Sequence, residues 1–208
     1  MRVLVTIGPT QEPLDAMRLI SNRSTGELGT RLALKLAEEG HRVIALRGTG
    51  STASPASLEH GNIRTIPFTT TENLHHELEK LSDGEQVDAV FHAAAVSDFY
   101  LPGAGSGKIP TREGALTLTL EPTPKLLPKM RKWFPRATIT GWKFEADGDR
   151  GTALSAGGTQ ITSCMSDSCV VNGPSYGEGF GVLSAEGDLI HLANRDSLCA
   201  HLVKLLTE

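Results

Sequence analysis

Residues 18–40 read RLISNRSTGELGTRLALKLAEEG, and this stretch decides how the first half of the chain folds. Apolar side chains recur there at the spacing of an amphipathic helix, at Leu28, Leu32, Leu36 and Ala37. Gly26 precedes the helix, and Gly40 is placed to cap its end. Because the first N–H groups of a helix attract anions, Gly26 predicts a phosphate-binding loop. The alternative is that Gly26 and Gly29 serve packing alone.

Strand-like and helix-like segments alternate on either side of this stretch. Apolar runs predict strands at residues 2–7, 41–46 and 62–68, from residue 87 onward, and at 136–142 and 167–173. Residues 71–81, with Thr71 as the N-cap, and residues 194–206 are expected to form helices. This alternation predicts an α/β fold with a Rossmann-like, doubly wound, mainly parallel sheet.

The second half of the chain is richer in β-type patterns. Residues 115–120 alternate like a half-exposed strand, and residues 179–192 predict a hairpin that turns near Glu186 and Gly187. We therefore expect a β-rich C-terminal part within a single domain that covers residues 1–208.

The composition argues against several classes of protein, although it leaves a local basic patch possible. A net charge of -4, with 21% charged residues, gives no basic excess of the kind that nucleic-acid binding needs. No run of 18 apolar residues is present, which argues against a membrane span. The three cysteines form no C-x-x-C pair, so a disulfide framework and a zinc ribbon are both unexpected. These features predict a cytoplasmic protein without a metal centre.

Ligands of open parallel sheets bind beyond the carboxyl ends of the strands. Four segments are expected to converge there: residues 8–26, 92–100, 107–111, and 121–127 with the nearby residues 141–142. A phosphate at the helix start would be held by Ser24, Thr25 and Gly26. Arg18 and Asn22 would add a positive charge and an amide to the same pocket.

An NAD(P)-dependent short-chain reductase is one alternative for this arrangement. About eighteen residues separate Ile7 from Gly26, whereas the glycine turn of those enzymes directly follows the first strand. The strand after the helix ends ALRG, without an acid to bind a ribose hydroxyl. Neither tyrosine is followed by a lysine four residues later. These three features weaken the reductase hypothesis.

The longest motif resembles another family, the phosphopantothenoylcysteine synthetases. Their first strand runs into Gly-x-Thr-x-Glu-Pro-(Leu/Ile)-Asp and then Arg-(Tyr/Phe)-Ile-Ser-Asn-x-Ser-Ser-Gly-x-Met-Gly; here residues 8–15 and 18–29 read GPTQEPLD and RLISNRSTGELG. Further segments match in order: HAAAVSDFY, KIP, LTLTLEPTPKLL, GWKFE, CVVNG and GFGVL. The chain thus resembles the phosphopantothenate–cysteine ligase half of the coenzyme A biosynthesis flavoprotein, over almost its whole length.

This resemblance implies ligation in two steps. The carboxylate of 4'-phosphopantothenate attacks the α-phosphate of CTP, or of ATP, to give an acyl-nucleotide and pyrophosphate. The amine of cysteine then displaces the nucleoside monophosphate. Mg²⁺ would accompany the triphosphate, the protein would be a homodimer, and a separate flavin decarboxylase would be its partner.

The resemblance also implies roles for particular residues. Asn22 would polarise the acyl carbonyl, Arg18 would support its loop, and Lys108 would stabilise negative charge on the phosphates. The nucleotide site would be lined by His92, Ala93, Ala94, Asp98, Thr123, Pro124, Lys125, Leu126 and Trp142. A structural role remains the alternative for Asn22 and Asp98 in turns, for Lys108 as a solvated lysine, and above all for His92 as a core histidine.

Several positions depart from the family pattern. The family's Lys-Ile-Lys-Lys is Lys-Ile-Pro-Thr at residues 108–111, and Lys125 replaces an acid. No lysine or arginine lies between Arg150 and Arg195, where the family has a lysine-bearing helix. Paired Gly157 and Gly158 argue against a long helix there. Losing two or three cations predicts phosphate binding weaker by several kcal/mol, since each charged hydrogen bond contributes about 1.5–3 kcal/mol. A divergent ligase, a paralogue that uses a different nucleotide and a non-catalytic nucleotide-binding homologue all fit this pattern.

Overall fold

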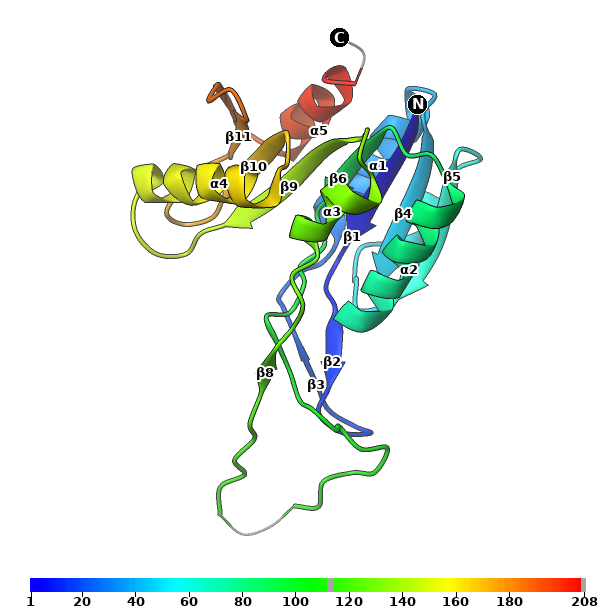
Figure 1. Cartoon of the computed structure of the whole chain (residues 1–208), viewed down its shortest axis with the longest axis vertical. Coiled ribbons are helices and arrows are strands. Elements are labelled where there is room, and N and C mark those ends of the chain that lie inside the picture. Colours follow the sequence, from blue (N-terminus) through cyan, green and yellow to red (C-terminus); the bar gives the residue numbers. More distant parts are fainter. Residues whose placement is uncertain (112–113, 207–208) are drawn as a thin grey trace.

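A computed structural model of the chain describes residues 1–111 and 114–206. Its centre is an eight-stranded sheet in the order β12-β11-β10-β9-β6-β1-β4-β5 (Figure 1). The strands of this sheet are β1 (Arg2–Ile7), β4 (Arg42–Gly48), β5 (Ile63–Phe68), β6 (Ala89–His92), β9 (Thr138–Phe144), β10 (Ser168–Asn172), β11 (Phe180–Ser184) and β12 (Leu189–Leu192). The first six of these strands pair in parallel, and β10, β11 and β12 pair antiparallel. The predicted α/β sheet and its β-rich end are confirmed.

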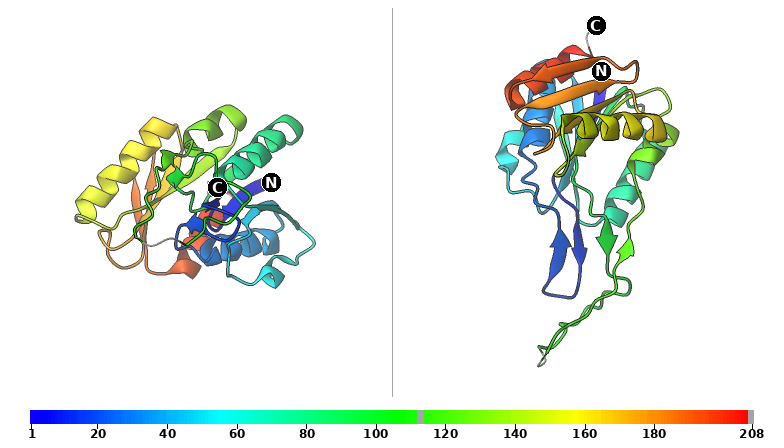
Figure 2. Two further views of the ribbon diagram at one scale, coloured as in Figure 1. Left: turned by 90° about the horizontal axis from the view of Figure 1, so that it is seen from below. Right: turned by 90° about the vertical axis from the view of Figure 1, so that its left-hand side faces the viewer.

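Helices cover both faces of the sheet (Figures 1 and 2). They are α1 (Glu27–Glu38), α2 (Thr71–Gly84), α3 (Leu127–Trp133), α4 (Arg150–Cys164) and α5 (Arg195–Lys204), with a short 3-10 turn η1 (Pro55–Leu58). Two small hairpins extend from the carboxyl edge: β2 (Gln11–Pro13) with β3 (Leu19–Ser21), and β7 (Phe99–Tyr100) with β8 (Glu121–Pro122). Among the described residues, no helix combines the length and apolar character needed to cross a membrane.

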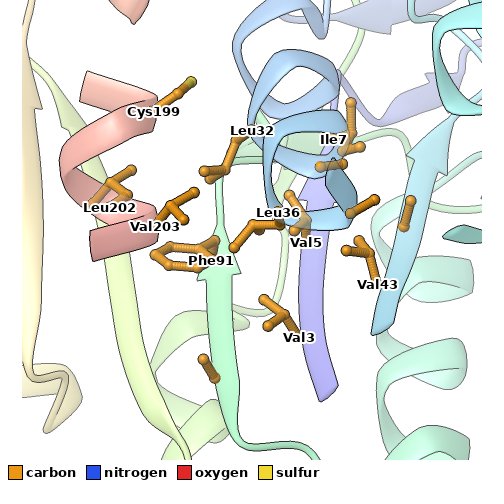
Figure 3. Close-up of a cluster of buried hydrophobic side chains, with 14 of the residues drawn as sticks. Val3, Val5, Ile7, Leu32, Leu36, Val43, Phe91, Cys199, Leu202 and Val203 are labelled. Atoms are coloured by element: carbon orange, nitrogen blue, oxygen red, sulfur yellow. The ribbon is translucent and has the colours of Figure 1, made fainter. Parts of the chain in front are cut away.

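Strand β1 is buried on both faces, which explains why its residues are apolar except Arg2 at its start and Thr6. Val3, Val5 and Ile7 face α1 and α5, and Figure 3 shows them beside the side chains of those helices. Leu4 belongs to the second cluster, under α2 and α3. Because side chains alternate between the two faces of a strand, β1 contributes residues to both hydrophobic clusters. This makes β1 the centre of the fold.

Strand β1 is also the point at which the chain changes direction across the sheet. Its two neighbours are β4 on one side and β6 on the other. Loops at such a switch point diverge and leave room for a ligand above the strand ends. This topology places the candidate site at the carboxyl ends of β1 and β6.

Three local expectations had different outcomes in the structure. Helix α2 is capped by Thr70, whose side chain accepts from the N–H of Asn73 at 3.1 Å, whereas Thr71 is the first helical residue. The hairpin turn was predicted correctly, with Gly187 at a φ of 96°. The strand predicted at residues 115–120 was wrong, since these residues form no strand and only Glu121–Pro122, directly after them, pairs. An alternating pattern forms a strand only where a partner strand is available.

The expectation that paired glycines prevent a helix was wrong. Helix α4 runs through Gly157 and Gly158 for 15 residues. A Cβ on Gly157 would lie 2.6 Å from Cγ2 of Val171 on β10, so this glycine lets the helix approach the sheet closely. Tertiary packing therefore outweighs the low helix propensity of glycine in α4.

The two glycines predict opposite effects of alanine. Gly158→Ala should raise the free energy of unfolding by about 0.5–1 kcal/mol, because the new Cβ meets only Cδ2 of Leu183, at 3.8 Å. Gly157→Ala should lower it by about 1–2 kcal/mol, because the methyl of buried Val171 must move. Urea denaturation measures the free energy of unfolding of both variants, and an unchanged m-value would show that the difference is one of stability alone. Equal stabilisation by the two changes would contradict the close packing of α4 on β10.

Candidate active site

The loops that follow β1 and β6 continue to pair beyond the sheet. The N–H of Ala95 donates to the carbonyl of Gly8 at 2.9 Å, and the N–H of Thr10 donates to the carbonyl of Ala95 at 3.2 Å. The hydroxyl of Thr10 accepts from the N–H of Ser97 at 2.9 Å. These bonds join the two loops into one unit at the carboxyl edge of the sheet, where a ligand would bind.

His92 lies at the root of this unit as a core histidine. It is buried, and its Nδ1 lies 2.9 Å from Oγ1 of Thr6. The same hydroxyl accepts from the N–H of Ala94 at 3.0 Å. Burial lowers the pKa of His92 to about 4, so the ring is neutral at pH 7. The imidazole therefore shapes the loop at Ala93 and Ala94 as a neutral group.

Asn22 connects the loop before α1 to the loop after β6. Its Nδ2 donates to the carbonyl of Val96 at 2.9 Å, while the residue as a whole is exposed. An amide nitrogen carries two hydrogens, so one donor remains for a ligand. The structure thus brings Asn22 beside the backbone of residues 93–98, as the sequence predicted.

The start of α1 is covered by the loop that follows β4. The carbonyl of Thr25 accepts from the N–H groups of Thr52 and Ala53 at 3.1 and 3.0 Å. Gly26 has a φ of 75°, and a Cβ there would lie 2.7 Å from Oγ of Ser51. That hydroxyl is buried without a hydrogen-bond partner among the described residues. Close packing therefore accounts for Gly26, while phosphate binding at Ser24, Thr25 and Gly26 stays a prediction.

Arg18 is held by Asp15 at the turn of the β2–β3 hairpin. Nε of Arg18 donates to Oδ2 of Asp15 at 3.0 Å, and Nη2 donates to the carbonyl of Ile109 at 2.8 Å. The Arg18 guanidinium, together with backbone N–H donors, holds the pKa of the Asp15 carboxyl well below its usual range. Lys108, next to Ile109, is exposed. The arginine thus lies beside the lysine segment.

Asp98 and the segment after β8 form a second group of contacts. The carbonyl of Asp98 accepts from the N–H of Thr123 at 2.9 Å, and its carboxylate pairs with Lys125. The hydroxyl of Thr123 donates to the carbonyl of Ser97. Leu126 is buried in the core under α2 and α3. Of the four predicted residues at 123–126, only Pro124 and Lys125 are exposed at this edge.

Trp142 lies on β9, half-buried against the cluster under α1 and α5. Its indole N–H is buried without a partner among the described residues. The next residue, Lys143, lines a pocket of about 620 Å³ together with Gly151, Thr152, Ser155, Ala156 and Thr159 of α4. Nζ of Lys143 also lies 2.9 Å from Oε1 of Glu145. Helix α4 therefore presents small and hydroxyl-bearing side chains to this pocket.

Two acids of the opening motif received no role from the sequence. Glu12 is buried, and its Oε1 accepts from the N–H and the hydroxyl of Thr71, at 2.8 and 2.7 Å, at the start of α2. Asp15 holds the hairpin and Arg18, as described above. Their presence in the matched motif was the signal that could have identified them. No group of three or more His, Cys, Asp or Glu side chains in residues 1–111 and 114–206 is arranged for a metal ion.

Comparison with known proteins identifies the family. Residues 1–204 match the model of the "DNA/pantothenate metabolism flavoprotein C-terminal domain". The chain therefore belongs to this family, and the prediction drawn from its motifs is confirmed.

Curated relatives include the coenzyme A biosynthesis bifunctional proteins CoaBC. The protein from Thermococcus kodakarensis is 34% identical over 171 residues, which cover 82% of this chain and 41% of the relative. The protein from Bacillus subtilis is 29% identical over 143 residues, covering 69% of this chain and 34% of the relative. The chain therefore spans less than half the length of both relatives.

Solved structures share the fold. A DNA/pantothenate metabolism flavoprotein from Streptococcus pneumoniae superposes with a TM-score of 0.86 at 21% identity, covering 100% of this chain and 98% of that one. A Cab2 mutant in complex with phosphopantothenate-cysteine gives a TM-score of 0.80 at 21% identity, covering 99% and 85%. These matches show the Rossmann-like architecture.

The neutral state of His92 predicts a specific dependence of stability on pH. Its pKa is about 4 when folded and 6.5 ordinarily, so the unfolded chain binds more protons between these values. The free energy of unfolding should therefore fall as the pH drops below 6.5, by about 2 kcal/mol at pH 5 through His92. His92→Gln should flatten this part of the profile, and exposed His76→Gln should leave it unchanged. Parallel profiles for all three proteins would exclude His92 as the cause.

Proposed function

We propose that this domain joins 4'-phosphopantothenate to cysteine through an acyl-nucleotide intermediate, in the biosynthesis of coenzyme A. The observation that carries the proposal is the hydrogen bond from Asn22 to the loop after β6. It brings an exposed amide donor beside a set of backbone groups at the switch point of the sheet. Membership of the family and the names of the CoaBC relatives support the same reaction.

The chemistry requires charge stabilisation more than a nucleophilic side chain. In the first step the substrate carboxylate forms a bond to the α-phosphorus of the nucleotide, and pyrophosphate leaves. In the second step the cysteine amine attacks the acyl carbon, the nucleoside monophosphate leaves, and the amine proton passes to solvent. Lys108 would stabilise the charge of the first step, and the second N–H of Asn22 would polarise the acyl carbonyl in the second.

CTP is the proposed co-substrate, and ATP is the alternative. The base and sugar of the nucleotide would lie along the backbone of His92, Ala93 and Ala94 and beside the exposed Pro124 and Lys125, with half-buried Trp142 in contact with the base. Lys125 pairs with Asp98 in an exposed contact, and Lys143 pairs with Glu145 in a half-buried one. An exposed pair is worth only about 0–1 kcal/mol, so a polyphosphate can compete most readily for Lys125. Mg²⁺ would be bound mainly through the phosphate oxygens, because the described residues provide no carboxylate cage.

The proposed assembly is a cytoplasmic homodimer that works with a flavin decarboxylase. Exposed apolar side chains gather on the two hairpins and the long arm between β7 and β8: Met17, Leu19, Phe99, Leu116 and Leu120. Apolar groups on elements that extend from the body are typical of an interface between proteins. Light scattering at several concentrations tests the dimer.

Release of pyrophosphate tests the reaction directly. With CTP or ATP, we expect pyrophosphate only when 4'-phosphopantothenate is present, and phosphopantothenoylcysteine only when cysteine is added. A non-catalytic homologue would bind CTP in a thermal-shift assay and release nothing. A reductase would instead change the fluorescence of NADPH on binding. Either of the last two results would replace the ligase proposal.

Two substitutions separate the two steps. Asn22→Asp should leave nucleotide binding nearly intact and slow conversion of the acyl intermediate by about 100-fold, because a carboxylate cannot donate to the carbonyl. Lys108→Gln should slow formation of the intermediate by a similar factor of about 100. Asn62→Asp is the matched control, since its amide also donates to a backbone carbonyl, that of Ala37 at 3.2 Å. Exposed Lys80→Gln on α2 controls for charge. Wild-type rates in both Asn22→Asp and Lys108→Gln would contradict the catalytic roles proposed for these two residues.

A further inference from the structure

Asp15 is a buried carboxylate in an exposed turn. Its side chain is 1% exposed, whereas Met17 in the same turn is 72% exposed. Oδ1 accepts from the N–H groups of Met17 and Arg18, both at 2.8 Å, which closes the β2–β3 hairpin. Closing a turn needs one oxygen only. The second oxygen therefore serves another purpose.

Oδ2 of Asp15 binds a segment that lies far along the chain. It accepts from the N–H of Ile109 at 2.9 Å and from the guanidinium of Arg18. Arg18 in turn donates from Nη2 to the carbonyl of Ile109 at 2.8 Å. The N–H of Ala16 donates to the carbonyl of Gly107 at 3.3 Å. The hairpin thus holds the backbone immediately before and immediately after Lys108.

The segment that is held would otherwise be free to move. Gly103, Gly105 and Gly107 precede Lys108, and glycine loses the most conformational freedom when it is ordered. Figure 2 shows the arm extending from the same end of the sheet as the β2–β3 hairpin. The side chain of Lys108 is exposed while its neighbours are fixed. This arrangement fixes the origin of the lysine side chain and leaves its ammonium free to reach a ligand.

We propose that Asp15 and Arg18 form a clasp that positions Lys108 over the active site. The inference rests on the proposed function, because it assigns a positioning role toward a lysine that acts in the first step. Asp15 touches neither substrate nor nucleotide in this assignment. The guanidinium serves two partners at once, the Asp15 carboxylate and the Ile109 carbonyl, which a lysine cannot reproduce with the same geometry.

Hydrogen exchange tests the clasp without reference to activity. In Asp15→Asn the amide of Ile109 should exchange at least about tenfold faster, because the carboxylate that accepts its N–H is lost. Arg18→Lys should have a similar effect. The matched control is Asp167→Asn, since Oδ2 of Asp167 also joins an arginine and a remote amide, Arg131 at 2.8 Å and Ile139 at 2.6 Å. Unchanged exchange at Ile109 in both clasp variants would overturn the clasp.

A double-mutant cycle tests the positioning role. Asp15→Asn should slow formation of the acyl-nucleotide by about 10- to 100-fold, as expected when a catalytic group is misplaced by about 1 Å. The double variant, Asp15→Asn with Lys108→Gln, should form the acyl-nucleotide no more slowly than Lys108→Gln alone, because the two residues act as a unit. If the rate loss of the double variant equals the product of the two single losses, Asp15 acts through general stability, and its positioning role toward Lys108 is overturned. If wild-type protein releases no pyrophosphate, the ligase proposal and this role both fail, while hydrogen exchange still decides whether the clasp exists.

Discussion

The pairing between the loop after β1 and the loop after β6 is the constraint on which the rest of the site depends. Two backbone hydrogen bonds through Ala95, and one through the hydroxyl of Thr10, extend the sheet beyond its carboxyl edge. The β2–β3 hairpin starts directly from this extension, and Asn22 returns to it through Val96. Because β1 is buried on both faces, its end is a fixed platform. Loops anchored to such a platform can hold side chains in one place.

Charge at this edge is distributed differently from what the family pattern implies. Cations come from separate segments, Lys108 on the arm, Lys125 after β8 and Lys143 on β9, while α4 contributes hydroxyl groups and small side chains. Two of these lysines already face acids. A polyphosphate bound here would exchange one acidic partner for another, so its affinity would depend on the strength of those two ion pairs. Electrostatics at this edge would therefore set how tightly a polyphosphate binds, while contacts to the base would set which nucleotide is used.

Much of the candidate site was predictable because a single motif carries most of it. Arg18, Asn22 and Gly26 lie in one matched segment, and the structure brings that segment beside residues 93–98. Leu126 shows where sequence reasoning fails, since Pro124 and Lys125 before it are exposed while its own side chain is part of the core. Asp15 is the opposite case, a residue without a predicted role that the structure places in an important contact. Its partner Ile109 is 94 residues away, and no local pattern indicates a contact at that distance.

The sequence alone determined the order and type of most elements, because burial on two faces requires continuous apolar runs and helices require a regular stripe. It also determined the family, through a motif long enough to be specific. Only the tertiary structure decided that α4 forms despite Gly157 and Gly158, since a missing Cβ becomes an advantage only when Val171 packs against it. The same holds for residues 115–120 and for the clasp at Lys108. In each case the outcome depends on which parts of the chain folding brings together, or fails to bring together.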